Sequence, residues 1–165
     1  MLYSYHTDAG NSNGEIPKKN PFFVCYNTVM HTYHSKHRQI PGTDYREVMK
    51  NARKEYVKVQ KLTKRQPYVR SKYFSRDKVF ITIFWNHLAQ KRKGEQIVRA
   101  KLLLPAFDLL RNTPHEPESI VDSGRMLHRF YGKTADGVEF AVQVKHDIKT
   151  GRKDFMSVFP RKNKR

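Results

Sequence analysis

Three segments near the end of the chain alternate apolar with polar residues, and the polar positions combine cations, hydroxyls and aromatic rings. The segments are MLHRFYGK from residue 126, VEFAVQVKH from residue 138 and DFMSVFP from residue 154. Because successive side chains of a β-strand point to opposite faces, each segment divides into two faces. The polar face would suit phosphate groups and a stacked base. It carries Arg129, Tyr131, Gln143, Lys145, Phe155, Ser157 and Phe159.

The opposite face is mostly apolar, and we expect it to pack against helices. It carries Met126, His128, Phe130, Val138, Phe140, Val142, Val144, Met156 and Val158. His128 is thereby turned away from the polar face unless a β-bulge re-aims it. The stretches TADG and DIKTGRK between the segments are typical hairpin turns, so the segments form an antiparallel meander. Polar residues on an open sheet face are also normal where that face only meets water. The excess of cations and rings favours a binding surface.

His87 is a further candidate for chemistry, because imidazole is the side chain best suited to proton transfer near neutral pH. It lies in FWNHL, residues 84–88, among apolar neighbours. Such a position suits a core histidine with one satisfied ring nitrogen equally well, and the sequence leaves both interpretations open. His146, at the end of a predicted strand, more often caps a turn than takes part in catalysis.

The charge balance restricts the class of partner. The chain has 33 Lys and Arg against 15 Asp and Glu, a net charge of +18. This excess predicts a polyanionic partner, and nucleic acid is favoured. We expect no membrane partner and a cytoplasmic location, because there is no run of 18 apolar residues and the start, MLYSYHTDAGNSNGEIPKKN, lacks the features of a signal peptide. The single cysteine, Cys25, excludes an internal disulfide and a cysteine-clustered zinc site.

Residues 43–66 are predicted to form a basic amphipathic helix. Asp44 and Glu47 have the spacing of a capping box, and Pro67 disfavours helical geometry in the residue before it. Apolar residues recur every three or four positions, at Tyr45, Val48, Met49, Ala52, Tyr56, Val59 and Leu62. Residues 43–76 contain eleven Lys or Arg against three acidic residues. A solvated helix face and a row of cations that faces phosphates are both consistent with this pattern.

Residues 67–165 are predicted to hold the main domain. KVFIT at residues 78–82 has the composition of a strand, and residues 84–110 favour helices divided near Gly94 and Pro105. The polar, Pro-rich stretch NTPHEPESIVDSG, residues 112–124, is predicted to be a connecting loop. The predicted fold class is therefore α+β, with helices followed by a three- to four-stranded antiparallel β-meander packed against them.

Residues 1–42 are predicted to be a partly ordered N-terminal arm with one short strand at residues 22–26. His31, His34 and His37 are three residues apart, yet no carboxylate or second cysteine joins them before Asp44. A solvated His-rich turn is therefore favoured over a metal site. We expect neither a metal nor a cofactor.

The stretches KVFITIFWNHL, LHRFYGKTADGVEFAVQVK and FMSVFP together resemble the phage-associated Barnase/EndoU/Colicin/RelE-like nuclease domains, known as the BECR fold. The resemblance covers roughly residues 68–161. It implies helices before a four-stranded antiparallel sheet, and cleavage of RNA without a metal. It also implies a toxin or mobile-element effector with a neutralising immunity or antitoxin partner, which charge complementarity would make acidic.

Metal-free RNA cleavage, which the resemblance implies, has chemical requirements that particular residues of this chain could meet. Attack of a ribose 2′-OH on its phosphate requires a base, an acid and donors for the developing charge. The candidates are His87 for proton transfer, Arg129 and Lys145 as phosphate-binding cations, and Ser157 as a phosphate donor. Substrate contacts would come from Tyr131, Gln143, Phe159 and His128. The second proton-transfer group stays open among Lys145, His128 and His146. The alternative function is a catalytically inert, basic nucleic-acid-binding accessory protein.

Overall fold

Four helices and seven strands make up the computed structural model, which describes residues 31–161. The strands are β1 (Thr32–His34), β2 (Tyr68–Arg70), β3 (Lys78–Phe80), β4 (Glu118–Asp122), β5 (Arg125–Lys133), β6 (Glu139–Asp147) and β7 (Lys153–Pro160). The helices are α1 (Tyr45–Lys61), α2 (Ile83–Ala89), α3 (Lys93–Lys101) and α4 (Leu103–Asn112). The strand predicted at residues 22–26 lies outside the described residues. Within residues 31–161, no helix is both long enough and apolar enough to cross a membrane.

All seven strands belong to one mixed sheet in the order β1-β5-β6-β7-β3-β2, with β4 also pairing with β5. The strands β5, β6 and β7 form the predicted antiparallel meander at its centre, but β1 pairs with β5 and β3 with β7 in parallel. The chain is α+β, as expected. The prediction of a three- to four-stranded antiparallel meander as the whole sheet was wrong, because the sheet has seven strands and mixed direction.

The strands that the sequence missed are short or lie in segments with loop composition. Both β1 and β2 are three residues long, too short for an alternating pattern to show. The strand β4 lies inside the stretch predicted to be a connecting loop. It pairs with β5 through a two-residue turn in which Ser123 and Gly124 both have positive φ, 47° and 80°. Two positive φ angles are typical of the tight turns that join antiparallel strands.

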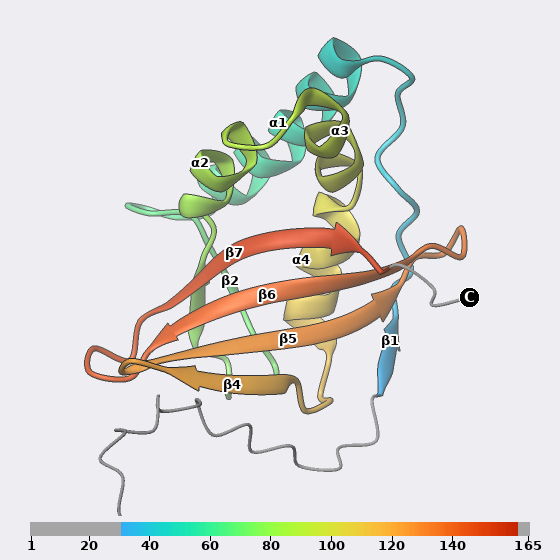
Figure 1. The fold of residues 1–165 in the computed structure, drawn as a ribbon. Coiled ribbons are helices and arrows are strands. Elements are labelled where there is room, and N and C mark those ends of the chain that lie inside the picture. The colour runs from blue at the N-terminus through green and yellow to red at the C-terminus, as the bar shows by residue number, and fades with distance from the viewer. Residues whose placement is uncertain (1–30, 162–165) are drawn as a thin grey trace, which may run out of the picture.

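Helix α4 covers one face of the central strands, and Figure 1 shows it passing behind β5, β6 and β7, with the other three helices above β7 in that view. The core between the helices and the sheet is aromatic, and Phe84, Phe107, Phe140 and Phe155 are among its largest fully buried side chains. We call the face of β5, β6 and β7 that α4 leaves uncovered the open face. In Figure 1 it looks toward the viewer.

A β-bulge in β7 exchanges two side chains between these faces. Gln143 pairs with Ser157 and Val144 with Phe155, so Met156 is the extra residue without a partner. Phe155 is consequently fully buried and stacks on Phe84 with ring centroids 4.9 Å apart. Placing Phe155 on the polar face and Met156 in the core was therefore wrong, because a bulge interrupts strict alternation.

Helix α1 begins where the sequence predicts. The Glu47 N–H donates to Asp44 Oδ1 over 3.0 Å, and the Thr43 N–H donates to Glu47 Oε2 over 3.0 Å. The first bond caps the helix at Asp44, and the second reaches the N–H of the residue before the cap rather than that of the cap itself, so the capping box is only half formed. The helix ends at Lys61 rather than near Gln66. The Thr63 hydroxyl donates to the Gln60 carbonyl over 3.0 Å and so satisfies one of the last helical acceptors.

The buried carboxylate of Asp108 on α4 fixes the edge of the sheet at β1. Asp108 is 3% exposed and accepts hydrogen bonds from the Ser35 hydroxyl at 2.7 Å and the Lys36 N–H at 3.2 Å. Asn112, one turn further along α4, donates to its other oxygen over 2.8 Å. A buried carboxylate needs such donors, so these bonds hold the segment after β1 against α4.

Gly132 in β5 provides a test of the packing between sheet and α4. A Cβ at this position would lie 2.6 Å from Phe140 Cζ and 2.7 Å from Leu109 Cδ1. Overpacking of this kind costs about 1–3 kcal/mol. We therefore expect Gly132→Ala to lower the free energy of unfolding by that amount, measured by urea denaturation. Gly94→Ala in α3 is the matched control, since its Cβ would meet nothing within 4 Å. Equal stabilities for the two variants would contradict this packing.

Candidate functional site

The open face and the two helices beside it form two adjoining pockets that contain most of the predicted site residues. The first, the His87 pocket, has a volume of about 350 Å³ and is lined by His87, Gln90, Lys91, Arg99, Gln143, Met156, Ser157 and Phe159. The second, the Tyr131 pocket, has a volume of about 630 Å³ and is lined by Gly94, Glu95, Val98, Arg99, Arg129, Tyr131, Ala141, Phe159, Pro160 and Arg161. The two pockets share Arg99 and Phe159, and together we call them the groove.

The His87 pocket brings together residues from α2, β6 and β7. His87 is in the last turn of the short helix α2 and is partly exposed. Gln143 and Ser157 are directly paired across β6 and β7, so their side chains are neighbours on the open face. An imidazole thus shares one pocket with an amide and a hydroxyl. His87 was predicted separately from the polar face, and the structure brings it beside two residues of that face.

Arg99 on α3 connects the two pockets, and it is a residue that the sequence reasoning missed. Its guanidinium donates to the Ser157 hydroxyl over 2.6 Å and lies 5.6 Å from the centre of the Phe159 ring. Glu95, one turn earlier in α3, lies 3.6 Å from it. The local sequence shows only an i, i+4 pair of Glu and Arg on a helix. That α3 places this pair over the sheet depends on tertiary packing.

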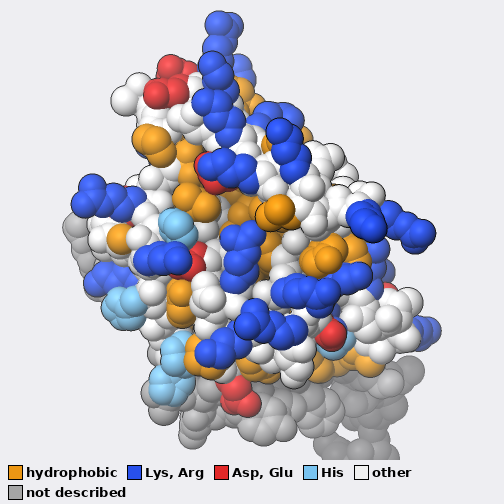
Figure 2. Space-filling model, turned by 180° about the vertical axis from the view of Figure 1, so that it is seen from behind, with side chains coloured by type: hydrophobic (Ala, Val, Ile, Leu, Met, Phe, Trp, Pro, Cys, Tyr) orange, Lys and Arg blue, Asp and Glu red, His pale blue; other side chains and the backbone are white. Residues whose placement is uncertain are grey.

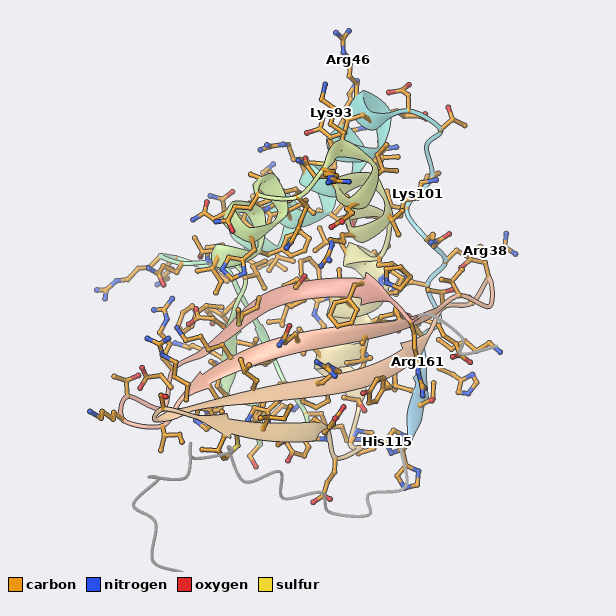
Figure 3. The ribbon with its side chains drawn as sticks, viewed as in Figure 1. Arg38, Arg46, Lys93, Lys101, His115 and Arg161 are labelled. Carbon is orange, nitrogen blue, oxygen red and sulfur yellow. The ribbon has the colours of Figure 1, made fainter. Side chains whose placement is uncertain are left out.

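The Tyr131 pocket combines cations with aromatic rings. The guanidinium of Arg129 lies 6.0 Å from the centre of the Phe159 ring, which is therefore flanked by two guanidinium groups. Arg161 lies 4.9 Å above the Tyr131 ring, and Figure 3 shows it projecting from the end of β7 in front of the sheet. Rings and cations in one pocket are the contacts that stack a base and hold its phosphate.

Glu118 on β4 adds a carboxylate beside this pocket, in addition to Glu95 in its lining. The Tyr131 hydroxyl donates to Glu118 Oε2 over 2.5 Å, and Arg129 lies 3.4 Å from the same oxygen. Burial, and then the hydrogen bond to Glu118, raise the pKa of the Tyr131 phenol above its ordinary value. The phenol is therefore a donor at neutral pH. The sequence reasoning missed Glu118 because it treated β4 as a loop.

Arg129 has donor capacity that the described residues do not use. Its one ion pair among them is the 3.4 Å contact to Glu118, and its buried Nε–H has no hydrogen-bond partner among them. Lys145 lies on the open face too, paired across the sheet with Leu127 and Asp154, but it lines neither pocket. The four predicted catalytic residues therefore do not form a single cluster: His87 and Ser157 share one pocket, Arg129 lines the next, and Lys145 lies outside both.

His128 and His146 lie on the helix-facing side of the sheet, as strand alternation predicts. The hydroxyl of Ser119 lies 2.8 Å from His128 Nδ1, and His128 Nε2 lies 3.4 Å from His146 Nδ1. His128 is 4% exposed, with the Phe74 ring centre 5.0 Å from its own. Neither histidine lines the groove. The structure thus places the predicted substrate contact His128 apart from the other predicted site residues.

The described residues offer no group of three or more His, Cys, Asp and Glu side chains arranged to hold a metal ion. Comparisons with models of known families, with curated proteins and with solved structures find no match. The resemblance to BECR nucleases therefore stays a prediction from the sequence.

The buried His128 beside His146 predicts a pH dependence of stability. Burial first, then the charges of His146 and Lys153, lower the pKa of His128 to about 4 from an ordinary value of 6.5. At pH values between these two pKa values, the unfolded chain holds a proton on His128 that the folded chain does not. The free energy of unfolding therefore falls as the pH falls. We expect the free energy of unfolding to drop by about 2 kcal/mol from pH 7 to pH 5 through this group, measured by urea denaturation.

The matched variants for this measurement are His128→Asn and His115→Asn. His128→Asn removes the titrating group, so the loss of stability between pH 7 and pH 5 should shrink. What is left is the contribution of His146, because burial also lowers the pKa of His146. His115→Asn leaves His128 in place and should keep the pH dependence that His128 supplies. The same pH slope in wild type and His128→Asn would contradict the assignment, whatever the absolute stability of the variant.

Proposed function

We propose that the protein is a metal-independent endoribonuclease whose substrate lies in the groove. The observation that carries the proposal is that His87, Ser157, Gln143 and Phe159 line one pocket. These residues come from three separate parts of the chain. Their types match what attack of a 2′-OH on phosphate requires, namely a proton-transfer group and donors to the phosphate oxygens.

The contacts of Arg99 support a phosphate position between the two pockets. Its guanidinium and the Ser157 hydroxyl are already in contact, and Lys91 lines the same pocket. A phosphodiester bound there would accept hydrogen bonds from a planar cation and a hydroxyl, which is how guanidinium groups hold phosphates. His87 would then be the proton donor or acceptor for the ribose or the leaving oxygen.

The adjoining Tyr131 pocket supports a position for a nucleotide next to that phosphate. Phe159, with Arg99 and Arg129 nearby, would offer its ring to a base, and Arg161 and Tyr131 lie in the same pocket. Stacking on an aromatic ring is worth about 1–3 kcal/mol per base. Burial and the hydrogen bond to Glu118 raise the pKa of Tyr131, so its phenol would act as a donor rather than as a base. A second proton-transfer group is therefore still required. Among the carboxylates beside the groove, Glu118 and Glu95 are the candidates, and either would act together with His87.

The decisive variant is His87→Ala. A positioned proton-transfer group contributes about a hundred- to ten-thousand-fold to the rate. We expect RNA cleavage in excess EDTA, with 2′,3′-cyclic phosphate ends, to fall at least about a hundredfold in His87→Ala. RNA affinity should change little, because the Lys and Arg side chains that contact phosphates dominate counterion release and stay in place. The measurement is single-turnover cleavage of a labelled mixed-sequence RNA beside the matching DNA.

His115→Ala is the matched histidine control, since His115 lies at the opposite end of the molecule from α2 (Figures 1 and 3). It should cleave as the wild type does. If wild type cleaves no RNA but binds it with steep salt dependence, the catalytically inert nucleic-acid-binding protein replaces the nuclease. If His87→Ala cleaves at the wild-type rate, a nuclease remains but His87 has no part in it.

Arg99→Gln tests the proposed phosphate position. The plot of log affinity against log salt has a negative slope. Removing one cation from a phosphate contact should make that slope less steep by about 1. Cleavage should fall together with affinity, because the phosphate loses both Arg99 and the orientation of Ser157. Arg38→Gln, in the segment between β1 and α1, is the charge-matched control (Figure 3). Equal salt slopes for the two variants would remove Arg99 from the substrate site.

A further inference from the structure

Helix α1 carries a row of cations along one surface outside the groove. Positions three or four residues apart share one face of a helix. The row, which we call the α1 stripe, consists of Arg46, Lys50, Arg53, Lys54, Lys58 and Lys61. All six side chains are exposed, and they line one shallow depression with Met49 and Val57. In Figure 2, which shows the face opposite to that of Figure 1, Lys and Arg predominate over acidic side chains.

The stripe is poorly compensated by the protein's own acids. Among the described residues, Lys58 is the one member with an ion pair, 2.7 Å to Glu55. Arg53 contacts the Trp85 ring at 5.1 Å. Cations that neighbour cations at helical spacing repel one another and destabilise the helix. A stripe built only to keep the helix solvated would alternate in sign, so this pattern indicates an anionic partner.

We propose that the α1 stripe binds the phosphate backbone of a base-paired RNA segment. From Arg46 to Lys61 the helix rises about 22 Å, long enough to follow several successive phosphates of a duplex. Contacts to phosphates and ribose hydroxyls are the usual way in which proteins hold A-form RNA. Single-stranded RNA would call for exposed rings on which bases stack, and no aromatic residue lines this depression.

The composition of α1 argues against the other anionic partners. A helix that lies on a membrane inserts a broad apolar face into lipid, but the apolar residues Val48, Ala52 and Val59 of α1 are buried in the core. The centre of a protein interface is usually apolar and depleted of charge. The stripe instead offers six cations around Met49 and Val57.

The α1 stripe is a surface separate from the groove, because the two share no lining residue. It would hold a folded RNA by a base-paired stem while an unpaired part of the same molecule reaches the groove. The inference rests on the proposed function only in taking RNA as the partner. It does not depend on cleavage, so binding to duplex and cleavage of single strands are measured separately.

The experiment compares two triple variants with equal loss of charge. Lys50→Gln, Lys54→Gln and Lys61→Gln together neutralise half of the stripe. Lys36→Gln, Lys72→Gln and Lys149→Gln together remove three exposed lysines from other parts of the surface. Both triples are made in the full chain with His87→Ala, so that the probe survives the titration. The probes are an RNA duplex of about 16 base pairs and a single strand of the same length. Fluorescence anisotropy gives affinity as a function of KCl concentration.

We expect the stripe triple to lower the duplex salt slope by about 2–3 and the duplex affinity by about tenfold or more. The control triple should lose far less of its duplex affinity and of its duplex salt slope. The affinity for the single strand should be similar in both triples. Equal losses in the two triples would overturn the inference, since only the total charge would then matter. Equal weakening of duplex and single strand in the stripe triple would overturn the preference for duplex.

Two additional measurements separate this inference from its alternatives and from the proposed nuclease. Binding to vesicles that contain anionic lipid, lost in the stripe triple while duplex binding is kept, would overturn RNA as the occupant. Cleavage of single-stranded RNA is measured for the stripe triple with His87 intact, and should stay at the wild-type rate. The wild-type protein could bind the duplex through the α1 stripe and yet cleave no RNA. That outcome would support the proposed role of the stripe and contradict the proposed nuclease.

Discussion

The extra residue in β7 decides which side chains the centre of the sheet presents to each face. With strict alternation, Phe155, Ser157 and Phe159 would all share one face. The bulge at Met156 instead sends Phe155 into the core against Phe84 and keeps Ser157 and Phe159 open. One eight-residue strand therefore supplies both a central core ring and two residues of the groove. The docking of α2 and the composition of the groove both depend on this register.

The parts of the fold that long periodic segments encode could be predicted from the sequence. The three long strands and the start of α1 at Asp44 follow from local patterns. Gly94, which was predicted to separate two helices, instead lies in the first turn of α3, and the break falls at residues 90–92. The short strands could not be predicted, because three residues carry no period and their pairing depends on partners distant in sequence. The carboxylate of Asp108, which holds the segment after β1, lies more than seventy residues away from it. No local pattern reports such a contact.

The candidate site was partly predictable for the same reason. Alternation alone places Tyr131, Gln143, Ser157 and Phe159 on one face, and the structure gathers all four around the groove. Arg99 and Glu118 escaped prediction, because their positions depend on how α3 packs over β7 and on a strand with the composition of a loop. The bulge misplaced Phe155, since nothing in DFMSVFP marks the extra residue. Prediction therefore failed where geometry is set between elements rather than within them.

Arg99 has a consequence for how the two pockets behave together. Its guanidinium is bonded to Ser157 and rests against Phe159, and these contacts form part of the walls of both pockets. A ligand that draws the guanidinium toward one pocket necessarily alters the wall of the other. Occupancies of the two pockets are then thermodynamically linked, and the linkage is equal in both directions. The groove would respond as one cooperative unit, in which filling one end sets the affinity at the other.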